Sequence, residues 1–534
     1  MHAAEPIGAA ALAPRACLAD HVAHTARESP TAAAVVFGET RWTYAELDRR
    51  VGVLASELLE LGIRRGDRVA TLSTPRPQFL LLFLAASRIG ALWMGLNPRY
   101  RPQELTWLLE DARPALLAVL ASLEGETLAA MQAAAAASPT ACRLVEFGRD
   151  PGEAGISLAA SSPSRAAARL IAGAEHAPDD PAMLVYTSGS TGRPKGALIS
   201  HYGLCFGSLV QATALGLNRP KMICNLPINH VGCVADICSV VLVQGGTLVF
   251  QERFDPAWML EAIEAERVTV WGGVPTMFQL MTEHPRFATA DLSSVELCLW
   301  GGAAMPRPLI NRLLARGFRL RGAYGLTETS CHVAFTQPEA TAEALEHTIG
   351  RPTPHTPCRI VDQAGRACAA GIAGELQVFG RQNFVGYWHQ PQVSAAAFTA
   401  DGWLKTGDLA AWTEEGDIRL VGRLREVIKS GGYSIYPREI ELALDSHPGV
   451  NACAVVGVPD PLFQEVPIAF VVAKPGQSPD IQALETFLRA RLANYKVPKR
   501  IVLLAALPTL PIGKVDKSAL RALAAQLRAT PPGP

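Results

Sequence analysis

Short apolar runs alternate with helix-like segments along most of this chain. Between residues 18 and about 120, apolar runs at 33–37 and 68–72 flank a segment with helical character. The alternation returns from 182 to 420, with glycine at many of the junctions. Because parallel strands need a crossover of a dozen or more residues between them, this pattern favours an α/β fold built on parallel sheets.

Individual helix signals support this interpretation. Thr43 followed by Glu46 has the form of a capping box, in which two side chains satisfy free N–H groups at a helix start. The most apolar stretch, 79–88, is too short before its closing arginine to cross a bilayer, so it predicts a buried helix and no transmembrane segment. The Ala- and Ser-rich region 121–179 says little about structure.

The 534 residues are too many for one core and suggest two or more domains. Strand signals at 374–379, 403–406 and 418–421 recur without long helices between them, which predicts a small β-barrel-like lobe. The residues that follow have an αβ pattern of their own. We therefore expect an N-terminal domain at 1–424, made of two αβ sheets and this lobe, and a small, mobile α+β domain at 425–534.

Composition and charge exclude several classes of protein. Basic and acidic residues number 49 each, so no net field attracts nucleic acid or an anionic membrane. The N-terminus lacks the shape of a secretory signal. Eleven cysteines without C-x-x-C or zinc-type spacing indicate free thiols, and we expect a cytoplasmic protein. Cys224, Cys233 and Cys238 are close in sequence and are expected to be buried as small apolar groups.

The segment 186–196, YTSGSTGRPKG, combines three glycines with hydroxyls and two cations. It follows a short apolar strand at 182–185 and leads towards a helix. A glycine-rich loop between a strand and a helix can turn N–H groups and hydroxyls towards phosphate oxygens, and Lys195 adds positive charge. Lys195 follows Pro194, so the segment is not a Walker A sequence, in which the lysine follows glycine. It predicts a phosphate-binding loop of another kind.

Four further segments combine glycine with chemically active side chains. They are GAYGLTET at 322–329, WLKTGDL at 403–409, VGRLREVIKSGGY at 421–433 and PIGKVDK at 511–517. Together with the glycine-rich loop, these segments resemble, in the same order, the motifs of the adenylate-forming superfamily. That superfamily includes acyl-CoA synthetases, luciferases and the adenylation domains of peptide synthetases, and the resemblance extends over roughly residues 20 to 525.

The resemblance implies a site for ATP. Tyr324 would stack on adenine, Thr327 would bind the α-phosphate as a catalytic group, and Glu328 would hold Mg²⁺. Asp408 would accept hydrogen bonds from both ribose hydroxyls, and Arg423 would also contact the ribose. The other implied nucleotide contacts are Thr187, Ser188, Gly189, Ser190, Thr191, Gly192 and Lys195 in the phosphate loop, and Gly301, Gly302, Ala303 and Gly325.

The resemblance also implies roles for the C-terminal part. Lys514 would be the adenylation catalyst, contacting the substrate carboxylate and the α-phosphate, and a freely rotating ammonium suits two anions. Lys517 is expected at the surface. Arg425 would be the hinge about which the C-terminal domain rotates, in a position where Lys or Asp is commoner. The residues implied for the pantetheine tunnel of CoA are Lys429, Gly431 and Gly432.

The segment NLPINHVGCVAD at 225–236 resembles the part of the family that meets the acid. His230 would lie beside the carboxylate, with Asp236 and Trp300 in the substrate pocket. A satisfied core histidine is the alternative for His230. Asp236 stands in an otherwise apolar stretch, where an isolated buried charge is costly. Either it recognises an amino, guanidino or hydroxyl group of the acid, or it is capped or reaches solvent.

The implied reaction has two steps. A carboxylic acid and ATP give acyl-AMP and pyrophosphate, and the thiol of CoA then gives acyl-CoA and AMP. One alternative is a freestanding adenylation enzyme that loads an acyl or aminoacyl group onto an acyl carrier protein. Another is a binding protein that kept the fold and lost the chemistry. The sequence leaves open which acid is used and whether the protein is a homodimer.

Overall fold

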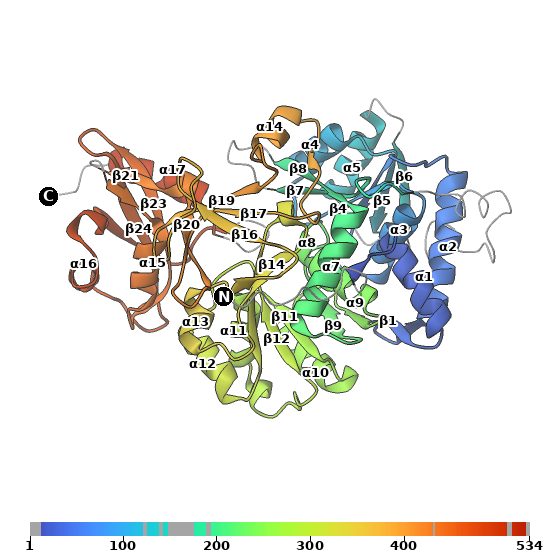
Figure 1. Cartoon of the computed structure of the whole chain (residues 1–534), viewed down its shortest axis with the longest axis horizontal. Helices are drawn as coiled ribbons and strands as arrows, with labels where there is room; N and C mark the ends of the chain where they lie inside the picture. Colours follow the sequence, from blue (N-terminus) through green and yellow to red (C-terminus); the bar gives the residue numbers. More distant parts are fainter. Residues whose placement is uncertain are drawn as a thin grey trace. The chain divides into compact units, whose positions relative to one another are not determined.

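A computed structural model of the chain divides it into two compact units (Figure 1). The first unit comprises Met1–Cys358 and Val378–Leu404, and the second comprises Arg359–Gln377 and Lys405–Pro534. The second unit thus takes in β-rich segments before residue 424, and the predicted domain boundary at that residue stays a prediction. The structure describes residues 12–120, 125–137, 142–147, 176–187, 194–430, 433–509 and 515–529.

The first unit contains a nine-stranded sheet in the order β15-β14-β13-β12-β11-β9-β10-β1-β2. Every neighbouring pair from β13 to β1 is parallel, as the alternating sequence pattern predicts. The strands are β1 (Ala33–Phe37), β2 (Thr40–Thr43), β9 (Lys221–Cys224), β10 (Thr247–Phe250), β11 (Val270–Gly273), β12 (Leu297–Trp300), β13 (Leu320–Gly325), β14 (His332–Phe335) and β15 (Arg351–Pro352).

A second sheet of seven strands has the order β18-β8-β7-β4-β3-β5-β6 and is parallel from β7 to β6. Its strands are β3 (Arg68–Leu72), β4 (Leu92–Leu96), β5 (Leu116–Leu120), β6 (Arg143–Phe147), β7 (Pro181–Thr187), β8 (Lys195–Ser200) and β18 (Gly386–Tyr387). The region 121–179, uninformative in sequence, supplies β6 and helix α5 (Glu126–Ala137).

The predicted helix signals are confirmed. Helix α2 (Tyr44–Glu60) begins with a complete capping box, in which the Thr43 hydroxyl accepts from the Glu46 N–H at 3.2 Å and the Thr43 N–H donates to the Glu46 carboxylate at 2.7 Å. Helix α3 (Pro77–Arg88) is buried from its first residue to Ser87. None of the helices in the described ranges combines the length and the apolar character that crossing a membrane requires.

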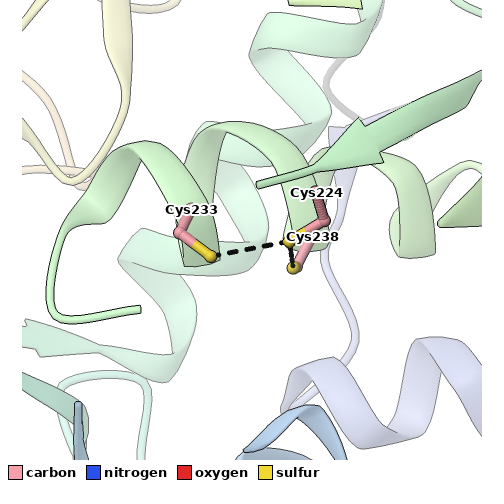
Figure 2. Close-up of side chains that lie close together, drawn as sticks. All are labelled: Cys224, Cys233 and Cys238. Atoms are coloured by element: carbon pink, nitrogen blue, oxygen red, sulfur yellow. Dashed lines mark hydrogen bonds between the residues drawn. The ribbon is translucent and has the colours of Figure 1, made fainter. Parts of the chain in front are cut away.

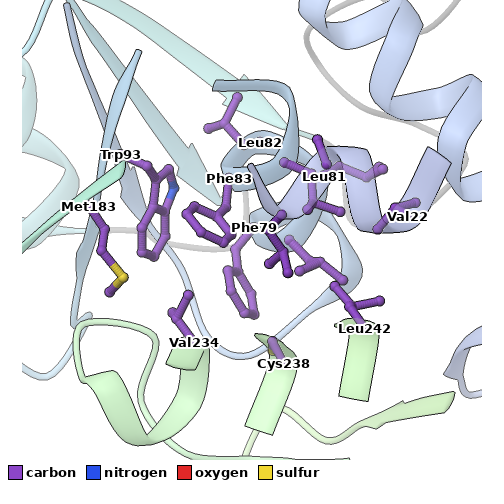
Figure 3. Close-up of a cluster of buried hydrophobic side chains, with 14 of the residues drawn as sticks. Val22, Phe79, Leu81, Leu82, Phe83, Trp93, Met183, Val234, Cys238 and Leu242 are labelled. Carbon is purple, nitrogen blue, oxygen red and sulfur yellow. The ribbon is translucent and has the colours of Figure 1, made fainter. Parts of the chain in front are cut away.

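The largest core cluster joins the two sheets. It draws side chains from strands of both and from α1 (Leu18–Glu28), α2, α3 and α7 (His201–Leu215). At its centre the Phe79 and Phe83 rings of α3 pack against Trp93 of β4, with ring centroids 6.0 Å and 5.2 Å apart (Figure 3). Aromatic pairs of this kind bury large apolar areas and fix the geometry of the sheets they touch.

A second core cluster covers the nine-stranded sheet with other helices. These are α10 (Pro256–Glu266), α11 (Pro275–Glu283) and α12 (Arg307–Ala315), which lie beside β11 and β12 (Figure 1). Along β12 the side chains alternate between the two clusters, with Leu299 in the first and Trp300 in the second. Because successive residues of a strand point to opposite faces, Trp300 faces away from the elements that Leu299 contacts.

The second unit holds two smaller sheets. Strands β16 (Cys358–Val361), β17 (Gly374–Val378), β19 (Leu404–Trp412) and β20 (Ile418–Arg423) form a four-stranded sheet where the sequence predicts a barrel-like lobe. The five-stranded sheet contains β21 (Ile428–Ser430), β22 (Tyr433–Ile435), β23 (Val450–Asp460), β24 (Gln464–Ala473) and β25 (Arg500–Leu504). Helices α15 (Pro437–Asp445) and α16 (Ile481–Arg489) pack in one of its core clusters, and α17 (Lys517–Ala529) packs in the other.

The expectation that Lys517 lies at the surface is wrong. Its side chain is only 22% exposed, and its Nζ lies 2.7 Å from Glu426 and 3.1 Å from Glu441. Burial lowers the pKa of Lys517, but the two carboxylates outweigh it, so the pKa lies above its ordinary value. Lys517 thereby ties the start of α17 to α15 and to the turn after β20.

Gly350 should be far less tolerant of a side chain than other glycines with positive φ. It has a φ of 72°, and a Cβ added there would overlap the backbone of Phe335. Gly317 has a φ of 84° but open space around the same position. We expect Gly317→Ala to cost about 1–2 kcal/mol from left-handed strain alone. Gly350→Ala should cost several kcal/mol more, because the backbone of β14 must also move.

The apparent Tm of each variant, measured by circular dichroism or scanning fluorimetry, compares the two substitutions directly. A clearly larger fall for Gly350→Ala is expected. Equal falls would show that the close approach of Gly350 to β14 does not exist.

Candidate active site

The chemically active residues after β13 are held by a tight turn. Tyr324 is near the end of β13 and only 7% exposed, and Thr327 is buried at the start of a short 3₁₀ turn (Thr327–Thr329). The Thr329 hydroxyl accepts from the Leu326 N–H and donates to the Cys331 carbonyl, both at 2.8 Å. The Thr329 side chain thus holds the backbone of the turn that carries Thr327.

Gly325 allows this turn to close. Its register partner on β14 is His332, and a Cβ at Gly325 would overlap the backbone of Cys331. Only a glycine lets the two antiparallel strands approach this closely.

Tyr387 joins Glu328 to Lys195. The Tyr387 hydroxyl donates to Glu328 Oε1 at 2.7 Å, and Lys195 Nζ lies 5.2 Å from the centroid of the same ring. The structure therefore brings together the predicted magnesium ligand and the predicted phosphate-loop lysine, which are 133 residues apart in sequence. Sequence reasoning missed Tyr387, because a tyrosine outside the motifs gives no sign that β18 pairs with β8.

The glycine-rich loop does not lead from a strand into a helix as the sequence predicts. It lies between the antiparallel strands β7 and β8, where Thr187 is paired with Lys195, and α7 begins only at His201. The apolar run 197–199 belongs to the largely buried strand β8, which lies between β18 and β7, instead of forming the approach to a helix. Ser188, Gly189, Ser190, Thr191 and Gly192 lie outside the described residues.

The loop after β12 carries the next predicted group. Gly301 is half-buried, and a Cβ there would lie 2.7 Å from His332 Nε2, so this imidazole edge lies against the Gly301 backbone. Gly302 has a φ of 81°, and both Gly302 and Ala303 are exposed. Trp300, predicted to line the acid pocket, packs in the cluster of α10, α11 and α12, and its pocket role stays a prediction.

His230 lies where the chain turns from β9 towards a distorted helix. It is the N-cap of the short α8 (Val231–Cys233), and its Nδ1 accepts from the Gly232 N–H at 3.0 Å. A neutral imidazole with Nδ1 as acceptor carries its hydrogen on Nε2. The turn thus sets the tautomer of His230.

Asp236 is neither exposed nor alone. It lies on a π-helical turn (Val234–Ser239), its side chain is 11% exposed, and its Oδ1 is 3.4 Å from His332 Nδ1. The same Nδ1 is 2.8 Å from Oε1 of Gln211, a buried residue of α7. Burial raises the pKa of the Asp236 carboxyl, while His332 and Gln211 act in the opposite direction. Sequence reasoning predicted Asp236 but missed both partners, which come from other elements.

The second unit holds the predicted ribose pair. Asp408 and Arg423 are register partners on β19 and β20, and Arg423 Nε lies 2.8 Å from Asp408 Oδ1. Asp408 is only 4% exposed. Arg425 is exposed in the following turn, and Lys429 is exposed on β21, where its N–H donates to Glu465 at 2.9 Å. Gly431, Gly432 and Lys514 lie outside the described residues.

Within the first unit, the predicted groups gather at the carboxyl ends of parallel strands. His230 follows β9, Gly301 follows β12, and Tyr324 to Glu328 close β13. This edge is where open α/β sheets bind their ligands. It presents a carboxylate, a phenol, a buried threonine and two imidazoles, a set suited to an acid and a nucleotide phosphate.

Comparisons with known proteins agree with this geometry. Residues 22–388 match the AMP-binding enzyme family, and residues 439–514 match the AMP-binding enzyme C-terminal domain. The chain is 38% identical to a feruloyl-CoA synthase of an Amycolatopsis species, and the match covers 93% of this chain and 96% of that one. It is 35% identical to the indoleacetate–CoA ligase of Aromatoleum aromaticum, with the same two shares covered.

Among solved structures, ATP-bound MatB from Rhodopseudomonas palustris is similar with a TM-score of 0.84 and 29% identity, over 95% of this chain and 99% of that one. The predicted fold class is therefore confirmed, with a large N-terminal part of mixed sheets and a smaller C-terminal part. The chain belongs to the AMP-binding enzyme family and is an AMP-forming acid–thiol ligase, which uses ATP and CoA to convert a carboxylic acid into its acyl-CoA.

Proposed function

We propose that this ligase activates an aromatic carboxylic acid that carries a hydrogen-bond donor on its ring system. Two relatives that cover almost the whole chain are named for feruloyl and indoleacetate, which are both aromatic. Ferulate carries a phenolic hydroxyl and indoleacetate a ring N–H. The observation that carries the proposal for this chain is the orientation of His332.

His332 offers an acceptor towards the loop after β12. Its Nδ1 faces two oxygens, Gln211 Oε1 at 2.8 Å and Asp236 Oδ1 at 3.4 Å, so Nδ1 carries the hydrogen. In the neutral ring Nε2 is then an acceptor. Because Nε2 lies against the Gly301 backbone, it can accept from a hydroxyl or N–H of an acid that occupies this edge of the sheet.

In the first step, a carboxylate oxygen attacks the α-phosphorus of ATP and pyrophosphate leaves. We propose that Thr327 donates to an α-phosphate oxygen, that Lys514 neutralises charge on the carboxylate and the phosphate, and that Lys195 contacts the outer phosphates. Mg²⁺, when bound, neutralises phosphate charge, and Glu328 is the residue that would hold it. One carboxylate is enough, because Mg²⁺ usually takes most of its ligands from phosphates and water.

In the second step, the CoA sulfur attacks the acyl carbon and AMP leaves. We propose that Lys429, Gly431 and Gly432 line the path of the thiol, and that Arg425 is the hinge between the two steps. Asp408 would bind the ribose hydroxyls in both steps, held by its contact with Arg423. His230 and Asp236 would position the acid from the turn after β9.

The location and the assembly of the enzyme are also proposals. None of the eleven cysteines forms a disulfide. Eight of them are buried or half-buried and lie outside the group formed by Cys224, Cys233 and Cys238. Free thiols favour a reducing compartment such as the cytoplasm. A homodimer stays a prediction, and native mass spectrometry of the purified protein decides between it and a monomer.

AMP release from ATP, measured across a panel of acids with and without CoA, tests the function. We expect release that requires both CoA and an aromatic acid. Acid-dependent pyrophosphate exchange without CoA-dependent AMP release would contradict the choice of CoA. Restoration of AMP release by a phosphopantetheinylated carrier protein would then identify the alternative acceptor.

Lys514→Ala should lose the first step and keep the second. Acid-dependent ATP–pyrophosphate exchange should fall about 100-fold or more, since a group that stabilises developing charge is lost. Thioester formation from supplied acyl-AMP should change little. Lys474→Ala, at an exposed lysine of the same unit, is the matched control. Equal losses in both half-reactions would contradict the role proposed for Lys514.

His332→Phe should remove selectivity for the donor on the acid. For an acid with a ring hydroxyl, kcat/KM should fall about tenfold or more, because a buried donor loses its acceptor. For the matched acid without the hydroxyl, kcat/KM should hold or rise. His347→Phe, at a more exposed histidine, serves as the control. If His332→Phe lowers kcat/KM equally for both acids, His332 does not accept a hydrogen bond from the ring hydroxyl.

A further inference from the structure

Three cysteines form a compact group of thiols (Figure 2). One of them, Cys233, ends the short helix α8, of which His230 is the N-cap. The Cys224 sulfur lies 3.6 Å from the Cys233 sulfur and 3.6 Å from the Cys238 sulfur. All three sulfurs lie within 4.8 Å of one another, and no other group of three candidate metal ligands occurs in the described residues. We call these three residues the trithiol cluster.

The cluster depends on a distorted helix. Cys224 is the last residue of β9, Cys233 ends α8, and Cys238 lies on the π-helical turn that follows. Two residues that are five positions apart point in clearly different directions on an α-helix. On the wider π-helical turn, the same two residues lie on nearly the same side of the helix. The π turn thus places Cys233 and Cys238 on the side that faces Cys224. Turns of this kind occur frequently at functional sites.

Within the described part of the chain, no Lys or Arg side chain compensates negative charge on Cys224, Cys233 or Cys238. All three cysteines are fully buried in the main core cluster, and Cys238 projects towards the side chains around Phe79 and Val234 (Figure 3). Burial raises the pKa of Cys238, and no described Lys or Arg side chain acts against it. A ligand that left a net charge at the three sulfurs would therefore bind less favourably, because burying an uncompensated charge costs free energy.

We propose that the trithiol cluster is a binding site for trivalent arsenic. Arsenous acid, As(OH)₃, and three thiols give As(SR)₃ and three molecules of water. Three As–S bonds form as three As–O bonds break, each thiol proton leaves with a hydroxide, and arsenic stays trivalent. The adduct is neutral, as an apolar site requires. Zn²⁺ with three thiolates would carry one negative charge, and Cu⁺ would carry two.

The spacing of the sulfurs suits a three-coordinate centre. Trivalent arsenic keeps a lone pair, so its three bonds are pyramidal, and three sulfurs about 2.3 Å from such a centre lie about 3.5 Å apart. The separations of 3.6 Å from the Cys224 sulfur to the other two are close to this value, so ligation requires only small rotations of the side chains. The neutral, small acid can enter when this part of the core opens locally.

Binding would tie the end of β9 to the turn between His230 and Asp236. We therefore expect arsenite to lower the rate of acid activation. This consequence rests on the proposed function, whereas the binding site itself does not. The test therefore measures the binding of arsenic first, by methods that do not depend on enzymatic activity.

The full-length, reduced protein is incubated with sodium arsenite and examined by native mass spectrometry and arsenic K-edge X-ray absorption. The expected result is one arsenic bound and three hydrogens lost per chain, with three sulfur neighbours around arsenic. Cys238→Ala should reduce the affinity at least tenfold. Cys205→Ala, at an equally buried cysteine outside the cluster, should bind as the wild type does.

Two outcomes would overturn the proposal. One is wild-type protein that binds no arsenic, or binds it with fewer than three sulfur neighbours. The other is a Cys205→Ala variant that loses as much affinity as Cys238→Ala. The absorption spectrum of the wild type decides the matter even if Cys238→Ala fails to fold. Arsenic binding without any effect on acid activation would support the proposed binding site and contradict only the expected inhibition.

Discussion

The parallel alignment of β9, β11, β12 and β13 is the constraint on which the candidate site depends. Parallel strands end at the same edge of a sheet, so loops from four distant parts of the chain open side by side. His230, Gly301 and the turn from Tyr324 to Glu328 all lie at this edge. The strands are short and mostly apolar, and the two core clusters on either face hold them in register. The backbone of the sheet therefore positions these residues side by side without the help of a ligand.

Hydrogen bonds made by side chains then fix the orientation of the groups that the strands position. Thr329 closes the turn after β13, Tyr387 anchors Glu328, and Gln211 sets the hydrogen of His332. In the second unit, the antiparallel register of β19 and β20 brings Arg423 onto Asp408. Lys517 holds two carboxylates of the same unit together. Pre-formed polar contacts of this kind limit the reorganisation that ligand binding requires.

Local features of the sequence predict much of this arrangement. The capping box at Thr43, the buried helix α3 and the strand alternation depend on nearby residues, and the structure confirms them. The motif residues could be predicted only because their order resembles a known superfamily. His332, Gln211 and Tyr387 could not be predicted, since each acts through a partner from a distant element. The strand β8 was missed because a short apolar run after a loop has no period that separates strand from helix.

The chemistry of this enzyme turns on the activation of the acid as an acyl-adenylate, through an attack of its own oxygen on the α-phosphorus of ATP. The most direct measurement uses an aromatic acid whose carboxylate is labelled with heavy oxygen, followed by mass spectrometry of the products. Attack by the carboxylate oxygen predicts one labelled oxygen in AMP and none in pyrophosphate. Label in inorganic phosphate, together with ADP as the nucleotide product, would contradict it.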